Sequence, residues 1–268
     1  MKFRNPKFFI FIFAAMMPLQ PFISEQFAGT IWRMEVDELN ETLFVEVRNN
    51  EDKQVSFTAI GLVNGEVYFK DLTTPERWLT GIEAAYGGVL LLHNYQSEAG
   101  PAHRGVIAID GKSGETLWSN YTFAFNHLGG NGPVIYDTRI QPRKFFLADI
   151  KTGATTRLYE PPVYKVLQNN IVVPDMIMAD TLPAGFLPMY PFENRIHYLE
   201  YNNLRIVSLH ALKAGQLIQS LFIADGDNVV YEDLLNAGIQ KMQPEAFIMY
   251  RNRLIFIKNK SELKVLTL

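Results

Sequence analysis

The residues with the greatest capacity for chemistry lie in one short stretch of the chain. His93 ends an apolar segment and His103 comes just before the next one, so a hairpin with residues 94–102 as its loop would bring both imidazoles to its base. Glu98 lies midway in that loop, and Arg104 follows His103. Two imidazoles and a carboxylate can hold a divalent metal ion, or supply a general base and the group that orients it. The sequence therefore predicts a candidate ligand or metal cluster made of His93, Glu98, His103 and Arg104.

Three neighbouring residues are candidate ligand contacts: Arg77, Trp78 and Glu83. Arg77 offers a guanidinium for an anion, and an exposed Trp78 beside acidic residues and arginine would suit a carbohydrate. The structural alternative is that Trp78 packs between sheets and that both histidines bond backbone groups of a long loop. We favour this alternative, because the spacing permits a site without specifying one.

No motif assigns a catalytic residue. The sequence has no Gly-x-Ser-x-Gly elbow, no His-Glu-x-x-His and no Walker loop. The glycine-rich turn after His127 lacks the strand-then-helix context of a phosphate loop, and His197 and His210 fall on expected strands. We therefore predict no cofactor, apart from the divalent metal that the cluster around His93 would accept.

Composition excludes several classes of function. The chain of 268 residues has 25 Lys and Arg against 28 Asp and Glu, a net charge of -3, and therefore lacks the basic field that nucleic-acid binding needs. It has no cysteine, which rules out disulfides, thiolate metal sites and cysteine nucleophiles. With 48% hydrophobic and 13% aromatic residues, the chain can bury a sizeable core as one domain, residues 18–268.

The elements that must position the cluster are strands in a recurring order. Four copies of a strand, a turn, a second strand and a tight turn with glycine end at Gly65, Gly114, Gly153 and Gly215. The spacing is irregular and brackets the length of a propeller blade, about 40 to 50 residues. The pattern predicts an all-β fold, most simply a small β-propeller of about five blades.

The turns of the second and third copies carry an aspartate four residues before the glycine. Asp110 precedes Gly114 and Asp149 precedes Gly153, where a carboxylate can accept backbone N–H groups across the turn. The segment 106–118, Val-Ile-Ala-Ile-Asp-Gly-Lys-Ser-Gly-Glu-Thr-Leu-Trp, resembles a blade hairpin of the quinoprotein-like propellers, and residues 146–153 are similar to it. This resemblance implies the fold and not the activity, because the quinone-dependent enzymes are eight-bladed and much longer.

The chain also resembles an uncharacterised bacterial family, classed as a domain of unknown function, over most of its length. Residues 29–34, Gly-Thr-Ile-Trp-Arg-Met, and the region 78–110 carry that resemblance. The family brings no known activity.

Three further features complete the predicted architecture. A proline-rich insertion at about 161–192 interrupts the repeat, since proline cannot donate to a sheet ladder. Asp227 could cap one short helix from Val229 to Met242. The last two strands form an incomplete fifth copy, and the alternating segment Thr30–Val36 would complete it, so that N- and C-terminal strands close the ring.

The first residues leave the compartment open. Lys2, Arg4 and Lys7 precede an apolar run that stops at Pro18, the order of a secretory signal peptide and too short to cross a bilayer. Translation from Met16 or Met17 would instead leave a cytoplasmic protein without this run. We favour export to the periplasm or cell envelope, and expect no transmembrane span.

The sequence supports two functions. The first is a non-enzymatic propeller scaffold that binds a protein or a small ligand on one face, because the repeat is well formed and catalytic motifs are absent. The second is a metal- or histidine-dependent hydrolase or lyase-like enzyme with its site near His93 and His103.

Overall fold

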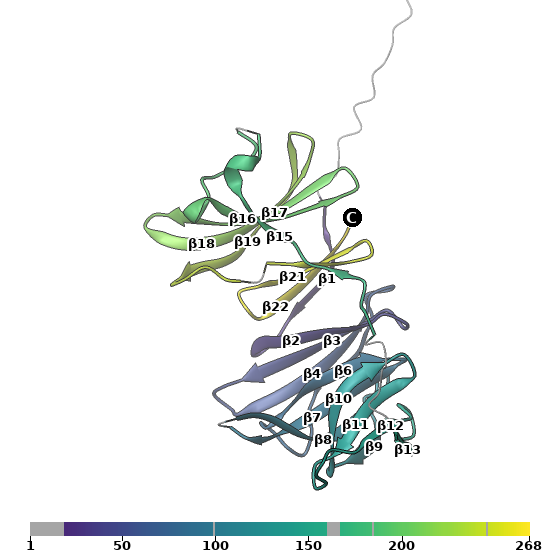
Figure 1. Ribbon diagram of the computed structural model, residues 1–268. Coiled ribbons are helices and arrows are strands. Elements are labelled where there is room, and N and C mark those ends of the chain that lie inside the picture. The colour runs from purple at the N-terminus through teal and green to yellow at the C-terminus, as the bar shows by residue number, and fades with distance from the viewer. Residues whose placement is uncertain (1–18, 99, 160–166, 184, 245) are drawn as a thin grey trace, which may run out of the picture.

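The structure is a computed structural model that describes residues 19–98, 100–159, 167–183, 185–244 and 246–268. It is an all-β protein with five antiparallel sheets (Figure 1). The segment 1–17 and the start of the proline-rich insertion fall outside the described residues, so the signal-peptide prediction lies there too. Among the described residues, no helix has the length and apolar character needed to cross a membrane.

Three sheets each consist of four strands that follow one another in the chain. The first has β2 (Thr30–Asp37), β3 (Thr42–Asn49), β4 (Gln54–Gly61) and β5 (Val67–Leu72). The second has β6 (Thr80–Tyr86), β7 (Val89–Ser97), β8 (Gly100–Asp110) and β9 (Thr116–Asn120). The third has β10 (Phe123–Gly129), β11 (Gly132–Asp137), β12 (Phe145–Ala148) and β13 (Thr155–Arg157). The predicted repeat is therefore a four-stranded meander.

The other two sheets have five strands each. One is consecutive apart from two short 3-10 helices, Ala179–Thr181 and Phe192–Asn194, and has β15 (Asp175–Met178), β16 (Arg195–Tyr201), β17 (Leu204–Lys213), β18 (Gln216–Asp225) and β19 (Asn228–Ile239). The last, which we call the composite sheet, has the order β1 (Pro21–Gln26), β22 (Glu262–Thr267), β21 (Arg253–Lys258), β20 (Ile248–Tyr250) and β14 (Ile171–Val172).

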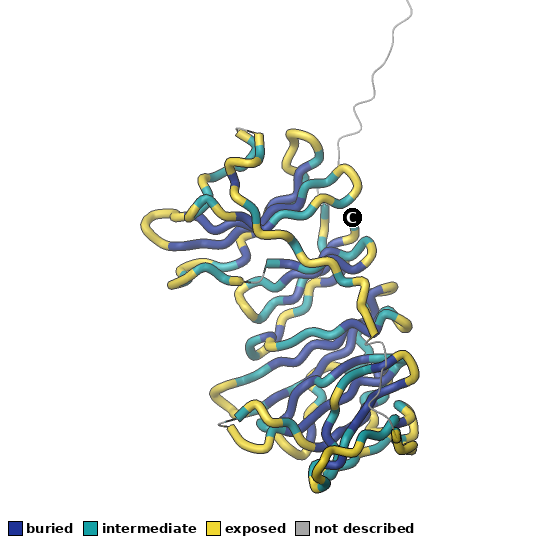
Figure 2. Tube along the Cα trace, in the orientation of Figure 1, coloured by how far each residue is buried: buried dark blue, intermediate teal, exposed yellow. Residues whose placement is uncertain are grey.

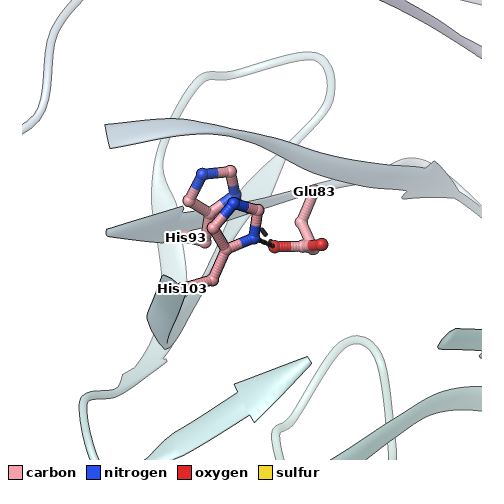
Figure 3. A group of neighbouring side chains, drawn as sticks. All are labelled: Glu83, His93 and His103. Carbon is pink, nitrogen blue, oxygen red and sulfur yellow. Dashed lines mark hydrogen bonds and ion pairs between the residues drawn. The ribbon is translucent and has the colours of Figure 1, made fainter. Parts of the chain in front are cut away.

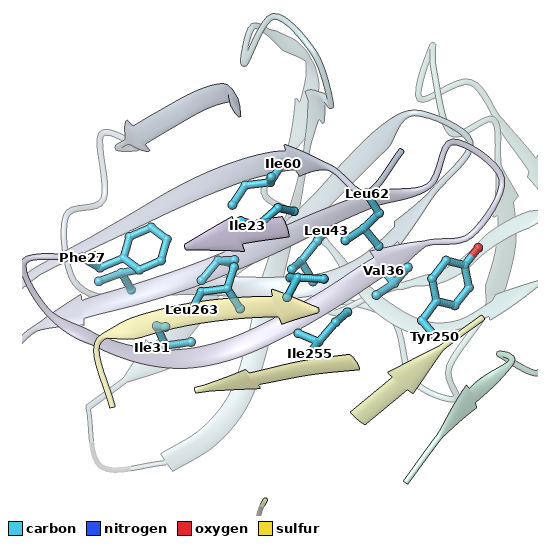
Figure 4. Packing of buried hydrophobic residues seen from close by; sticks show 13 residues of the cluster. Ile23, Phe27, Ile31, Val36, Leu43, Ile60, Leu62, Tyr250, Ile255 and Leu263 are labelled. Carbon is cyan, nitrogen blue, oxygen red and sulfur yellow. The ribbon is translucent and has the colours of Figure 1, made fainter. Parts of the chain in front are cut away.

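The five sheets lie in a row, with buried residues on the faces where neighbouring sheets meet (Figures 1 and 2). Leu43 of β3 packs with Ile255 and Leu263 of the composite sheet, as Figure 4 shows. On the other face of the β2–β5 sheet, Phe44 packs with Leu92 of β7. Equivalent clusters join the composite sheet to β15–β19 and the β6–β9 sheet to β10–β13. The row therefore runs from β15–β19 through the composite sheet, β2–β5 and β6–β9 to β10–β13.

Closure of this row into a ring stays a prediction. Within the described residues, no hydrophobic cluster joins β10–β13 to β15–β19, the two ends of the row. N- and C-terminal strands do pair, but through β1, whose Ser24 lies opposite Lys264 of β22. The segment Thr30–Val36, predicted to make this pair, instead pairs with β3, because it continues into a tight turn and a hairpin with that strand.

The predicted helix over Val229–Met242 is wrong. Residues Asn228–Ile239 form strand β19, which pairs along β18 with three irregularities in register. Leu235 is buried in the cluster that joins this sheet to the composite sheet, while Leu234 is exposed. The apolar spacing suited a helix, but pairing with a long neighbouring strand decided the conformation, as strand formation depends strongly on context.

The aspartate turns are as predicted. Oδ1 of Asp110 accepts the backbone N–H groups of Lys112 at 3.0 Å and Ser113 at 2.8 Å. The backbone N–H of Gly114 bonds the carbonyl of Asp110, and its φ of 74° is in the region that favours glycine. Asp149 and Gly153 repeat this geometry. These acids hold the hairpins, and their residue types follow from turn geometry.

Candidate metal centre

Irregularities in the β6–β9 sheet bring three titratable side chains together. The β6–β7 register shifts between Ile82 and Ala84, so Glu83 is the extra residue of a β-bulge. The β7–β8 register shifts after Leu92, beside Gly105 with its φ of 73°. Bulges turn side chains out of the regular alternation of a strand and are frequent next to functional sites.

Glu83, His93 and His103 form one compact group (Figure 3). Nδ1 of His93 and Nδ1 of His103 both lie 2.9 Å from Oε2 of Glu83. The two imidazoles are stacked, with centroids 3.5 Å apart and an interplanar angle of 7°. Tyr95 meets both rings edge-on. One carboxylate oxygen of Glu83 is therefore in close contact with the Nδ1 atoms of both imidazoles.

The histidines differ in burial and in hydrogen bonding. His103 has hydrogen-bond geometry to Glu83, and 29% of its side chain is exposed. His93 is 1% exposed, and its contact with Glu83 has ion-pair distance without hydrogen-bond geometry. Neither ring nitrogen of His93 has a hydrogen-bond partner among the described residues. A buried polar group left in this way costs about 1–3 kcal/mol, so His93 needs a partner that the described residues do not supply.

Burial and mutual contact set the protonation of the group. Burial would raise the pKa of Glu83, but the close polar contacts of its carboxylate with His93 and His103 outweigh burial and hold this pKa below its ordinary value. Burial lowers the pKa of His93, and the carboxylate of Glu83 opposes this shift only in part. At neutral pH, Glu83 is thus an anion and His93 is a neutral imidazole. These are the forms that bind a metal ion.

The distances suit a small divalent metal. Zinc lies about 2.0–2.2 Å from imidazole nitrogen and carboxylate oxygen, which places neighbouring ligand atoms of a tetrahedron about 3.4 Å apart. The observed separations of 2.9 Å require an opening of only about 0.5 Å. Three protein ligands with one position left free are typical of catalytic or ligand-binding zinc, whereas structural zinc usually has four.

A second layer of polar residues backs the group on the β2–β5 sheet. Glu46 is buried, and its Oε2 accepts the backbone N–H of Ile82 at 2.8 Å, next to Glu83 in the chain. Arg48 pairs with Oε1 of Glu46 and donates to the carbonyl of Thr80 at 2.7 Å. Glu46 and Arg48 therefore form an ion pair, and both make hydrogen bonds to the backbone of β6. These bonds hold β6 against β3.

The remaining candidates from the sequence lie apart from this group. Glu98 and Arg104 are exposed and are not members of it, so Glu83 takes the place predicted for Glu98. Arg77 is exposed and donates to Gln54. Trp78 is partly buried against the core between β2–β5 and β6–β9. The structure therefore brings the two predicted histidines together with Glu83 and leaves Glu98, Arg104 and Arg77 outside this group.

Trp78 also belongs to an aromatic group around Arg48. The Arg48 guanidinium lies 5.3 Å from the centroid of Trp78, 5.5 Å from Trp32 and 5.6 Å from Tyr95. Sequence reasoning missed Glu46 and Arg48 as neighbours of the site, because they belong to β3 and approach it through packing of the β2–β5 sheet on β6. It also missed Tyr95, which lies on β7 with His93. The only signal for Tyr95 was its position two residues after His93.

Comparison with known proteins gives a family of unknown function. Residues 36–118 match the family described as Domain of unknown function (DUF4905), which confirms the resemblance predicted for this part of the chain. The matched range includes all three residues of the group. No curated protein matches the sequence significantly.

Several solved structures show a distant likeness. BamB from Moraxella catarrhalis is 9% identical with a TM-score of 0.35, over 94% of this chain and 98% of that one. A europium-containing methanol dehydrogenase is 10% identical with a TM-score of 0.31, over 88% of this chain and 52% of that one. Saccharomyces cerevisiae Sqt1 is 7% identical with a TM-score of 0.36, over 94% of this chain and 100% of that one.

Proposed function

We propose that this protein is a non-enzymatic, propeller-like scaffold that binds a small ligand through a divalent transition metal held by Glu83, His93 and His103. The observation that carries the proposal is the pair of imidazole nitrogens, each 2.9 Å from the same carboxylate oxygen. Imidazole and carboxylate are ligands for zinc and its neighbours in the transition series, whereas calcium and magnesium prefer oxygen ligands.

The burial of His93 favours a metal site over a purely structural role for this group of side chains. A bracing role would satisfy the histidines with backbone or side-chain partners, yet the ring nitrogens of His93 have no hydrogen bond within the described chain. A metal on Nδ1 of His93 would use the atom that already faces Glu83. Metal-binding histidines usually donate their other N–H to a carboxylate or carbonyl, and Glu46 is the buried acid on that side of the ring.

Zinc titration of the full chain, after dialysis against a chelator, tests this proposal. We expect one zinc ion to bind per chain in isothermal calorimetry, with the affinity falling at least about a hundredfold in His103→Ala and in Glu83→Gln, because each removes one of three ligands. His127→Ala is the matched control, since His127 bonds its neighbour Asn126 outside the group. Circular dichroism checks that the variants fold.

Two results would contradict the proposal. One is a wild-type chain that takes up no zinc at micromolar concentration. The other is a His103→Ala variant that folds and binds zinc as tightly as His127→Ala does. Either result would leave Glu83 and the two histidines with a bracing role only.

A metal-dependent hydrolase is the second candidate. The observation that favours it is that His103 lines an open pocket, so a metal beside it could reach both water and a substrate. Zinc-loaded protein should then hydrolyse a chromogenic ester faster than His103→Ala does, and a chelator should stop the reaction. Equal rates for both proteins, or a rate that survives the chelator, would remove this candidate.

A further inference from the structure

A pocket of about 410 Å³ lies where the β6–β9 sheet meets the β10–β13 sheet. His103 lines it from β8, so the metal-binding group borders the pocket through its more exposed histidine. Phe125 and Tyr136 contribute aromatic surface from β10 and β11. The volume is enough for a small organic molecule.

The polar lining of the pocket is cationic or neutral. Arg143 is exposed, and its guanidinium stacks over the Tyr136 ring at 4.4 Å from the centroid. No described residue forms an ion pair with Arg143. Gln96 and Gln141 add amide groups, and none of the residues that line the pocket is acidic. A guanidinium held on an aromatic ring keeps its N–H edge free for an anionic partner.

We propose that this pocket binds a small organic oxyanion, a carboxylate or a phosphate ester, with Arg143 as its charged contact. The inference rests on the proposed function, because a metal at Glu83, His93 and His103 would place a second positive charge beside His103, at the border of the pocket. An oxyanion is the ligand that suits a guanidinium on one side and an open metal position on the other. The apolar body of the ligand would lie against Phe125 and Tyr136.

Cobalt-loaded full-length protein tests the proposal, because visible absorption bands of cobalt report a new ligand on the metal. Benzoate and phenyl phosphate are the two probes, and benzyl alcohol is their uncharged counterpart. We expect both anions to shift the spectrum and benzyl alcohol to leave it unchanged. A response to only one anion would identify carboxylate or phosphate as the source of the oxyanion.

Arg143→Gln is the decisive variant, and Lys144→Gln is its matched control. Both residues are exposed cations next to each other in the chain, but only Arg143 lines the pocket. We expect Arg143→Gln to bind cobalt normally and the anions at least about tenfold more weakly, because a charge-assisted hydrogen bond is lost. Lys144→Gln should bind both as the wild type does.

The outcomes separate the two proposals. Cobalt binding without any anion effect, or an anion affinity equal in Arg143→Gln and Lys144→Gln, overturns the oxyanion pocket and leaves the metal site standing. Equal binding of benzyl alcohol overturns it as well. Failure of the wild type to bind cobalt overturns the metal site, and the oxyanion pocket with it.

Discussion

Replacing Gly81 by alanine should disturb the metal centre without touching any of its three ligands. Gly81 lies on β6 directly opposite His93 of β7. A Cβ at this position would lie 3.1 Å from both Cε1 and Nε2 of His93, and 3.2 Å from Oε2 of Glu46. The missing side chain of glycine therefore makes the space that the buried imidazole fills.

The size of the effect follows from these distances. Ordinary van der Waals contact begins near 3.4 Å, so the imidazole must retreat by about 0.3 Å within a packed core. Overpacking of this kind lowers the free energy of unfolding by about 1–3 kcal/mol. Alanine also reduces the conformational entropy of the unfolded chain relative to glycine, which stabilises the fold by about 0.4–1 kcal/mol. We expect a net loss of about 1 kcal/mol. Zinc affinity should fall at least about tenfold, the range found when the surroundings of metal ligands are altered.

Urea unfolding and zinc calorimetry measure the two effects. Gly130→Ala is the control, because a Cβ at Gly130 would meet no atom within 4 Å. Wild-type stability together with wild-type zinc affinity in Gly81→Ala would refute the packing of His93 against β6. A loss of stability with unchanged zinc affinity would refute the assignment of His93 as a ligand.

Three further predictions concern groups outside the ligand set. Burial lowers the pKa of His210 from 6.5 to about 4, and its Nε2 accepts the backbone N–H of Gln243, so the unfolded chain takes up the proton first as the pH falls. The free energy of unfolding, measured by urea titration, should be constant above pH 6.5 and fall by about 3 kcal/mol by pH 4. A free energy that does not change with pH over this range would contradict a neutral buried imidazole at His210. Glu46→Ala should lower the free energy of unfolding by about 3 kcal/mol or more, because it leaves the largely buried Arg48 without its counter-ion. A loss under about 1 kcal/mol in urea unfolding would mean that the hydrogen bond to the Thr80 carbonyl suffices to stabilise the Arg48 guanidinium. Asp110→Ala should cost about 1 kcal/mol through its turn hydrogen bonds, and zinc calorimetry of that variant should match the wild type.

Local patterns in the sequence determined the repeated hairpins and the placing of two histidines on one of them, but not strand β19. The turn from Asp110 to Gly114 closes within five residues through hydrogen bonds of its own backbone and of the Asp110 side chain. His93 and His103 lie on neighbouring strands of one hairpin, which the sequence predicts, and the register shift after Leu92 completes their contact. The all-β class follows from the same short-range alternation.

Tertiary structure decided which carboxylate joins the two histidines. Glu98 is nearer to both in the chain, but the strands continue almost to the hairpin tip and leave this residue exposed. Glu83 comes from the preceding strand, and a one-residue bulge sets the direction of its side chain. A shift of one residue reverses the face of a strand, and no periodicity in the sequence records where such a shift occurs. The identity of the third ligand therefore depends on register, which only the paired strands establish.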